Sequence, residues 1–209
     1  MEDAKPKKLP IAVLLSGGGT TMLNLAGRIA DGALPAEIRL VVASNRAAKG
    51  IARAERLGLP VRVVPRKEFT SGELFSKFIF AHLRDAGVEL VCLAGFLSLL
   101  TIPEDYERRV MNIHPSLLPK FGGKGMHGRA VHEAVLAAGE AESGCTVHFA
   151  DNTYDTGPVI LQRRCPVLPG DTPEALAARV FEQECVAYPE AVAGFAADWV
   201  SDSPPSGRG

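Results

Sequence analysis

The chain has 209 residues, of which 46% are hydrophobic and 22% charged, a composition typical of one folded domain rather than of a disordered chain. The 23 basic and 24 acidic residues give a formal net charge of −1, without the positive excess typical of a nucleic-acid binder. No apolar run approaches the roughly 20 residues of a membrane span, and the first eight residues are too polar for a secretory signal. The four cysteines include no Cys-x-x-Cys pair that would suggest a metal site. We therefore expect a cytoplasmic protein.

Strand-like and helix-like segments alternate along the first half of the chain. The first of them, residues 11–16, is a continuous apolar run of the kind found in parallel strands buried on both faces. Helices of about ten or more residues between such strands favour a parallel, doubly wound sheet. We expect strands at residues 11–16, 38–44, 61–64 and 88–94, and helices at residues 21–30, 48–57 and 71–85.

The second half is less regular. Thr172 and Pro173 fit an N-cap followed by the first position of a long helix. We expect strands at residues 110–113, 144–149 and 159–167, and helices at residues 131–138 and 172–199. The fold class is therefore α/β: a Rossmann-like, mostly parallel twisted sheet with helices on both faces and antiparallel strands added in the C-terminal half. We expect one domain over residues 9–200, made of halves 9–95 and 96–200, and a disordered tail at 201–209 that is rich in Ser, Pro and Gly.

A glycine-rich turn, SGGGTT at residues 16–21, joins the first strand to the first helix. Glycines let the backbone approach a ligand closely, and the free N–H groups of a helix N-terminus suit a phosphate. The turn is not a Walker A loop, because no Gly-Lys-Ser/Thr follows, and Met22 occupies the third glycine position of a dinucleotide fingerprint. A phosphate site and a flexible turn both remain open, whereas a nicotinamide dinucleotide is disfavoured.

Residues 112–119, NIHPSLLP, place an amide and an imidazole at the end of a predicted strand. Asn112 and His114 are two residues apart, so their side chains share one face of the strand. In open α/β sheets, ligands bind beyond the carboxyl ends of the strands. An amide can donate a hydrogen bond to a developing oxyanion, and an imidazole moves protons near neutral pH. Pro115 and Pro119 stiffen the following loop, which favours a catalytic role over a structural one.

A second candidate segment, DNTYDTGP at residues 151–158, lies between two predicted strands. Asp155 is either a turn residue of the Asx type or a carboxylate aimed at His114, which would hold its tautomer and raise its pKa. Residues 121–128, FGGKGMHG, can form a lid, since glycines permit hinge motion. The other histidines are expected to be structural or solvated: His82, His127, His132 and His148.

Four segments, in this order, resemble the phosphoribosylglycinamide formyltransferase family over about residues 9–195: LAGF at 93–96, NIHPSLLP at 112–119, TVHF at 146–149 and DTGP at 155–158. The wider formyltransferase superfamily shares the Asn-x-His and the later Asp, whereas HPSLLPK and a lone catalytic domain indicate the glycinamide branch. The resemblance implies that the formyl group of 10-formyltetrahydrofolate passes to the amine of a phosphoribosylglycinamide in purine biosynthesis, without a metal.

The resemblance also implies roles for the matched residues. His114 is the general acid/base, Asn112 stabilises the tetrahedral intermediate, and Asp155 tunes and orients His114. Contacts to the ribonucleotide are expected at Gly19, Thr20, Thr21 and Glu184. Contacts to the folate are expected at Leu97, Ser98, Leu99, Leu100, Asn112, Asn152, Thr153 and Tyr154. The half 9–95 then binds phosphate, and the half 96–200 carries catalysis and folate binding.

The sequence departs from the family pattern in three places. The phosphate loop often reads Gly-Ser-Asn in the family and is Gly-Thr-Thr here, although hydroxyls can still donate to phosphate. Two family arginines correspond to Ser98 and Gly72, positions that bear on the recognition of the pterin or of the glutamate tail. The loop at residues 122–128 is longer than in the shortest members.

Three rival functions are less favoured. A formyltetrahydrofolate hydrolase carries an N-terminal regulatory domain, for which eight polar residues leave no room, and a tRNA formyltransferase needs a C-terminal basic domain. A nucleotide-binding module without activity does not need Asn112, His114 and Asp155 together. The expected partners are small-molecule substrates, with no nucleic acid and no membrane, and the protein is expected to be a monomer or a homodimer.

Overall fold

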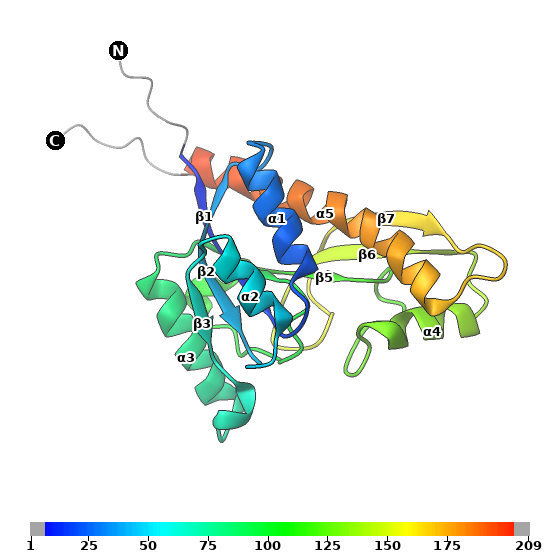
Figure 1. Ribbon diagram of the computed structural model, residues 1–209, viewed down its shortest axis with the longest axis horizontal. Helices are drawn as coiled ribbons and strands as arrows, with labels where there is room; N and C mark the ends of the chain where they lie inside the picture. Colours follow the sequence, from blue (N-terminus) through cyan, green and yellow to red (C-terminus); the bar gives the residue numbers. More distant parts are fainter. Residues whose placement is uncertain (1–6, 203–209) are drawn as a thin grey trace, which may run out of the picture.

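The computed structural model describes residues 7–202 (Figure 1). Within this range the strands form one seven-stranded sheet in the order β3-β2-β1-β4-β5-β6-β7. The first five strands pair in parallel, and β6 and β7 continue the sheet through antiparallel pairing, as predicted. The strands are β1 (Leu9–Leu15), β2 (Ala36–Ala43), β3 (Val61–Val63), β4 (Leu90–Leu93), β5 (Val110–His114), β6 (Glu142–Phe149) and β7 (Val159–Pro166).

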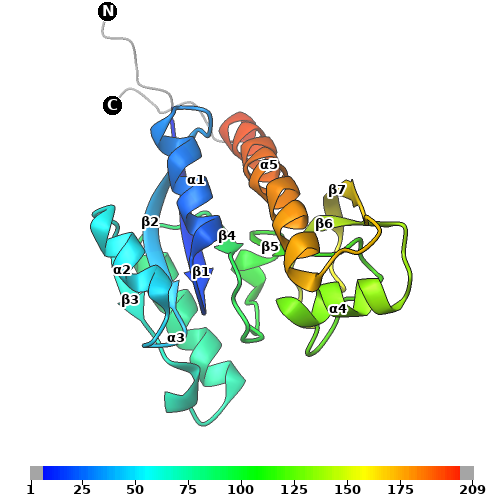
Figure 2. The ribbon, with the colours of Figure 1, turned by 45° about the vertical axis from the view of Figure 1, so that its right-hand side comes forward.

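Helices cover both faces of the sheet, which confirms the predicted fold class. On one face, buried side chains of α1, α2, α4 and α5 share a core with the strands, and α1 lies beside α5 (Figure 2). On the other face, Phe75, Ile79 and Phe80 of α3 form a second core. The helices are α1 (Thr20–Ala30), α2 (Lys49–Arg56), α3 (Gly72–Asp85), α4 (Arg129–Ala137) and α5 (Pro173–Asp202), with short 3-10 turns η1 (Arg66–Glu68) and η2 (Glu104–Tyr106).

Local sequence signals explain where the helices begin. The Ser71 side chain caps α3 by accepting a hydrogen bond from the Leu74 amide at 3.1 Å. The Thr172 hydroxyl likewise accepts from the Ala175 amide at 3.2 Å, and Pro173 is the first residue of α5, as predicted.

Helix α5 continues through Pro189, as predicted, and ends three residues beyond the predicted end at 199. Pro189 has no N–H to offer the carbonyl four residues earlier, that of Cys185. The Asn24 side-chain amide of α1 donates to that carbonyl instead, at 3.0 Å. Helix α5 also includes Ser201 and Asp202, which the sequence placed in a disordered tail, and the rest of that tail lies outside the described residues.

Tyr188 ties α5 to the sheet beneath the functional end of the molecule. Its ring is fully buried, and its hydroxyl lies 3.0 Å from the Leu93 carbonyl of β4 and 2.9 Å from the Met111 carbonyl of β5. We expect Tyr188→Phe to lower the free energy of unfolding by roughly 1–3 kcal/mol, because a buried acceptor loses its donor. Urea denaturation measures the change, with Tyr154→Phe as a control in a partly buried loop. Equal stabilities would show that the hydroxyl adds nothing to the docking of α5.

Candidate active site

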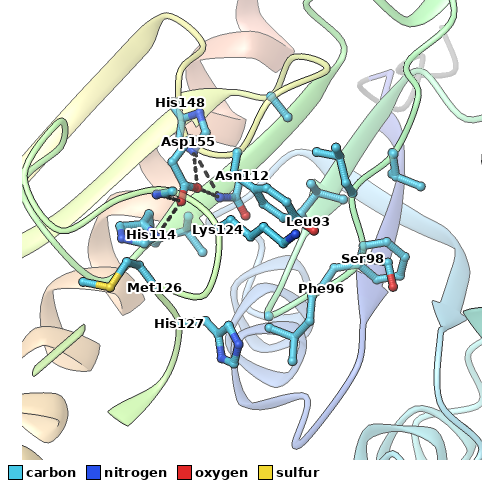
Figure 3. Close-up of a pocket in the computed structure, with 18 of the residues that line it drawn as sticks. Leu93, Phe96, Ser98, Asn112, His114, Lys124, Met126, His127, His148 and Asp155 are labelled. Atoms are coloured by element: carbon cyan, nitrogen blue, oxygen red, sulfur yellow. Dashed lines mark hydrogen bonds and ion pairs between the residues drawn. The ribbon is translucent and has the colours of Figure 1, made fainter. Parts of the chain in front are cut away.

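A cavity of about 460 Å³ opens beyond the carboxyl ends of β4 and β5 (Figure 3). This is the edge of an open α/β sheet at which ligands bind. Its walls come from segments far apart in the sequence, namely the loop after β4, the loop after β5, the loop between β6 and β7, and single residues of α1 and α5. The cavity is large enough for a small organic substrate.

Asn112, His114 and Asp155 meet at this cavity. Asn112 and His114 alternate along the end of β5, and both line the cavity. The Asp155 Oδ2 atom lies 3.5 Å from His114 Nδ1, and Asn112 Nδ2 donates to Asp155 Oδ1 at 3.3 Å. His114 is 4% exposed, so the three groups interact largely out of contact with water.

The loop at residues 150–158 positions the Asp155 side chain. The turn is stabilised by Asp151, whose carboxylate accepts from the Thr153 amide at 2.8 Å and from the Thr156 hydroxyl at 2.9 Å. Asp155 has a left-handed backbone with φ 57°, and its Oδ2 atom accepts from the Gly123 amide at 2.9 Å. Of the two interpretations of Asp155, the structure thus favours the carboxylate aimed at His114, since the turn bonds belong to Asp151.

The His114 ring is held at both nitrogens. Its Nε2 atom lies 2.8 Å from the Phe121 carbonyl, which can only accept, so Nε2 carries a proton. The nitrogen that gains and loses a proton is then Nδ1, which faces Asp155. Phe121 itself has a left-handed backbone with φ 57°, and this conformation turns its carbonyl toward the ring.

The charge of Asp155 raises the pKa of His114, as predicted, but the net shift of this pKa is downward. Burial lowers the pKa of His114 and outweighs the Asp155 charge and the Phe121 carbonyl, which both raise it. The His114 pKa therefore lies below its ordinary value, and the ring is mainly neutral at pH 7. Burial also raises the pKa of Asp155, but the neighbouring His148, the charge of His114 and the Gly123 amide together hold it below the ordinary value, so Asp155 is ionised.

His148, expected to be structural or solvated, belongs to the same cluster. It lies opposite Asn112 in the antiparallel pairing of β5 and β6 and is 1% exposed. Its Nδ1 atom donates to the Phe149 carbonyl at 2.9 Å, and its Nε2 atom lies 3.1 Å from Asn112 Nδ2. The sequence signals were the alternation of side chains along residues 144–149 and the TVHF segment, and they needed the pairing with β5 to become informative.

The amide nitrogen of Asn112 interacts with two neighbours. Its Nδ2 atom lies 3.1 Å from His148 Nε2 and donates to Asp155 Oδ1 at 3.3 Å. The role of Asn112 as a donor to an oxyanion stays a prediction.

At the predicted phosphate loop, Gly19 caps α1 in a left-handed conformation with φ 75°. A Cβ atom there would lie 2.8 Å from the Gly50 backbone, so only glycine fits. Thr21 lines the cavity, whereas Gly19 and Thr20 lie in the same turn outside its lining. The sequence did not single out Arg53, whose guanidinium donates to the Gly18 carbonyl at 2.9 Å and places a cation beside the turn.

Glu184 reaches the cavity from α5. Burial raises the pKa of its carboxyl to about 7. Glu184 of α5 and Thr21 of α1 both line the cavity, and their contact with one substrate stays a prediction.

The predicted folate residues form another wall of the cavity. Leu97 and Leu99 are 51% and 38% exposed and line the cavity together, where a flat apolar ligand would cover them. Asn152 is not part of the lining, since its Oδ1 atom accepts from the Ile102 amide at 2.8 Å and ties this loop to the loop after β4. The predicted residues that do line the wall are Leu97, Ser98, Leu99, Leu100, Asn112, Thr153 and Tyr154.

The model of the formyl transferase family matches residues 9–192. The chain belongs to the formyl transferase family. A member of the family from Haemophilus influenzae, named phosphoribosylglycinamide formyltransferase, is 36% identical over 187 residues, which cover 88% of this chain and 86% of that protein. The crystal structure of glycinamide ribonucleotide transformylase 1 from Symbiobacterium toebii matches with a TM-score of 0.87 and 35% identity, covering 94% of this chain and 92% of that one.

Some relatives are much longer. The trifunctional purine biosynthetic protein adenosine-3 of Drosophila pseudoobscura pseudoobscura is 43% identical over 194 residues, but the chain spans only 14% of its length. None of the helices formed by residues 7–202 is long and apolar enough to cross a membrane. The same residues contain no group of three or more His, Cys, Asp or Glu side chains that could hold a metal ion.

Proposed function

We propose that this protein transfers the formyl group of 10-formyltetrahydrofolate to the amine of N1-(5-phospho-D-ribosyl)glycinamide, giving the N-formyl product and tetrahydrofolate, in de novo purine biosynthesis. The observation that carries the proposal is the cluster of Asn112, His114 and Asp155 between an apolar wall and a glycine-rich turn. The wall suits a pterin and the turn suits a phosphate. Relatives over nearly the whole chain carry the name of this activity.

In this proposal the substrate amine is the nucleophile. Its nitrogen attacks the formyl carbon, the carbonyl π electrons move to oxygen, and a tetrahedral oxyanion forms. The amine proton passes to His114 Nδ1, which the depressed pKa keeps free to accept it, and the charge of Asp155 stabilises the cationic ring. The bond from the formyl carbon to the folate nitrogen then breaks, that nitrogen receives the proton, and the carbonyl re-forms.

An assay with three acceptors tests the proposal. Consumption of 10-formyltetrahydrofolate is followed with glycinamide ribonucleotide, with water alone, and with initiator tRNA as the acceptor. We expect rapid turnover with the ribonucleotide only, and loss of that turnover in His114→Gln. Turnover in water alone would indicate a hydrolase, turnover with tRNA a tRNA formyltransferase, and no turnover with any acceptor a binding protein.

The glycine-rich turn is proposed to anchor the ribose phosphate through its backbone. Gly19→Val should raise KM for the ribonucleotide far more than Thr20→Ala, because a side chain at Gly19 meets the Gly50 backbone and distorts the N-terminus of α1, whereas Thr20 is exposed. Steady-state kinetics measure both, and circular dichroism checks that Gly19→Val folds. Equal, small effects of the two changes would count against a phosphate site here.

The same proposal extends to the partners, metal content, location and oligomeric state of the enzyme. We infer small-molecule partners without nucleic acid or a membrane, no metal, a cytoplasmic location, and a monomer or homodimer. The near balance of charge supports the first of these inferences, since it provides no basic surface for a polyanion.

A further inference from the structure

A second pocket, of about 250 Å³, lies beside the loop that follows β5. It is enclosed by residues 117–121 of that loop, by the end of α4, and by β6 and β7. Among the residues that the structure describes, none lines both this second pocket and the active-site cavity. The second pocket is smaller than the roughly 300–1,000 Å³ typical of sites for drug-sized ligands, and it therefore suits a smaller molecule.

Part of the second pocket is apolar. Val135 of α4 and Leu118 are buried, and Phe121 packs against the core to which Val135 belongs. Leu117 and Pro119 complete this part of the lining. An apolar group of a ligand would be removed from water here, which stabilises the bound state.

A buried hydroxyl of the second pocket has no partner. Ser143 of β6 is 2% exposed, and its Oγ atom has no hydrogen-bond partner within residues 7–202. A buried hydroxyl without a partner costs free energy, and a polar group of a ligand would remove that cost. The Gln162 amide nitrogen donates to the Leu118 carbonyl and to Thr146 Oγ1, both at 2.9 Å, so the amide oxygen is left to accept from a ligand.

Charges of both signs surround the second pocket. Lys120 Nζ pairs with Glu140 Oε1 at 2.7 Å, and the Arg164 guanidinium pairs with Glu142 Oε2 at 2.9 Å. Both ion pairs are exposed, so they contribute little to stability and can exchange partners with a ligand. The two cations and two carboxylates sum to zero. A ligand with only one sign of charge is therefore attracted by one half of this set and repelled by the other.

We propose that the second pocket binds a free α-amino acid with an apolar side chain, at a site distinct from the one used for formyl transfer. The ligand carboxylate pairs with Lys120 and Arg164, and the ligand ammonium pairs with Glu140 and Glu142. The Ser143 hydroxyl donates to the carboxylate, and the ligand side chain lies on the apolar part of the lining. A zwitterion thus provides a partner for the buried hydroxyl and for charges of both signs.

The second pocket is connected to the active site through Phe121. This residue lines the pocket, and its carbonyl oxygen lies 2.8 Å from His114 Nε2. An amino acid in the pocket therefore packs against the loop that holds the His114 ring. Binding can be measured without turnover, so the test of this site does not depend on the proposed formyl transfer.

An NMR titration of the backbone amide signals with L-leucine tests the proposal. We expect saturable shifts at residues 117–121 and 142–143, with a Kd of about 1 mM or tighter. Isocaproate lacks the ammonium and isoamylamine lacks the carboxylate, so each should bind about tenfold more weakly or worse. Equal binding of all three compounds would overturn the proposal and indicate a purely apolar pocket. Shifts confined to the active-site cavity, or no shifts up to about 10 mM L-leucine, would also overturn it.

Two substitutions locate the site. Ser143→Ala should weaken the binding of L-leucine by about tenfold, and Glu142→Gln by about threefold, because each removes one partner of the ligand. Ser143→Ala should keep the stability of the unmodified protein in urea denaturation, since the Ser143 hydroxyl has no partner to lose among the described residues. Glu37→Gln is the matched control, because it removes a similarly exposed carboxylate that pairs with Arg39 on β2. Unchanged binding in both pocket variants, or an equal loss in Glu37→Gln, would refute the site.

Discussion

Asp155→Asn should lower kcat by about tenfold or more while KM for the ribonucleotide changes little. The carboxylate accepts from Asn112 Nδ2 and from the Gly123 amide, and it faces the proton-exchanging Nδ1 of His114. An asparagine at this position has only one oxygen that can accept from these donors. Its NH₂ group would therefore face another N–H donor, either that of Asn112 or that of Gly123. The variant also loses the charge that stabilises His114 when this ring takes the amine proton.

The pH dependence of kcat shows whether Asp155 raises or lowers the pKa of His114. Burial already lowers the pKa of His114, and Asp155 raises it, so Asp155→Asn should lower it further. NMR titration of the His114 ring protons measures this shift. Since His114 acts as a base, kcat should rise with pH through its depressed pKa and level off near neutrality, and the rising limb should move to lower pH in the variant.

Asp151→Asn is the matched control for Asp155→Asn. Asp151 lies in the same loop, and an asparagine there can still accept from the Thr153 amide. Its effect on kcat should be much smaller. If Asp155→Asn leaves both kcat and the His114 titration untouched, the pairing of Asp155 with His114 has no part in catalysis.

Local pattern predicted much of the fold. The buried run that forms β1, the cap at Thr172 and the antiparallel pairing of the last strands were all predicted from neighbouring residues. The bond from Asn24 of α1 was not, although it occupies the carbonyl that Pro189 cannot serve. A contact across 161 residues leaves no trace in a local pattern.

The same limit applies to the candidate site. Asn112 and His114 stand out because they alternate at a strand end, and Asp155 follows from the resemblance to a family. The position of His148 in the site depends on the pairing of β5 with β6, and that of the Phe121 carbonyl depends on a left-handed backbone conformation. The effect of Asp155 on the His114 pKa was predicted with the right sign, but the net downward shift was not, because burial, which outweighs the Asp155 charge, depends on the packing of the whole domain.

Glu184→Gln should weaken substrate binding and yet stabilise the protein at alkaline pH. The carboxyl of Glu184 has a pKa of about 7 in the folded state, against an ordinary value of 4.5. Between these values the folded protein holds one more proton than the unfolded chain, so the contribution of this group to stability falls as pH rises from 4.5 to 7. Above pH 7 the folded protein carries a partly buried charge that glutamine cannot acquire.

We therefore expect the free energy of unfolding of Glu184→Gln, relative to the unmodified protein, to be higher at pH 8 than at pH 5 by about 1–3 kcal/mol. KM for the ribonucleotide at pH 8 should rise by about tenfold or more, the value of a hydrogen bond to a charged group, with a smaller effect on kcat. Urea denaturation at the two pH values and steady-state kinetics measure these changes. Glu182→Gln, an exposed position on the same helix, serves as the control. A stability difference independent of pH would show that Glu184 titrates as it does in water, and an unchanged KM would remove it from the substrate site.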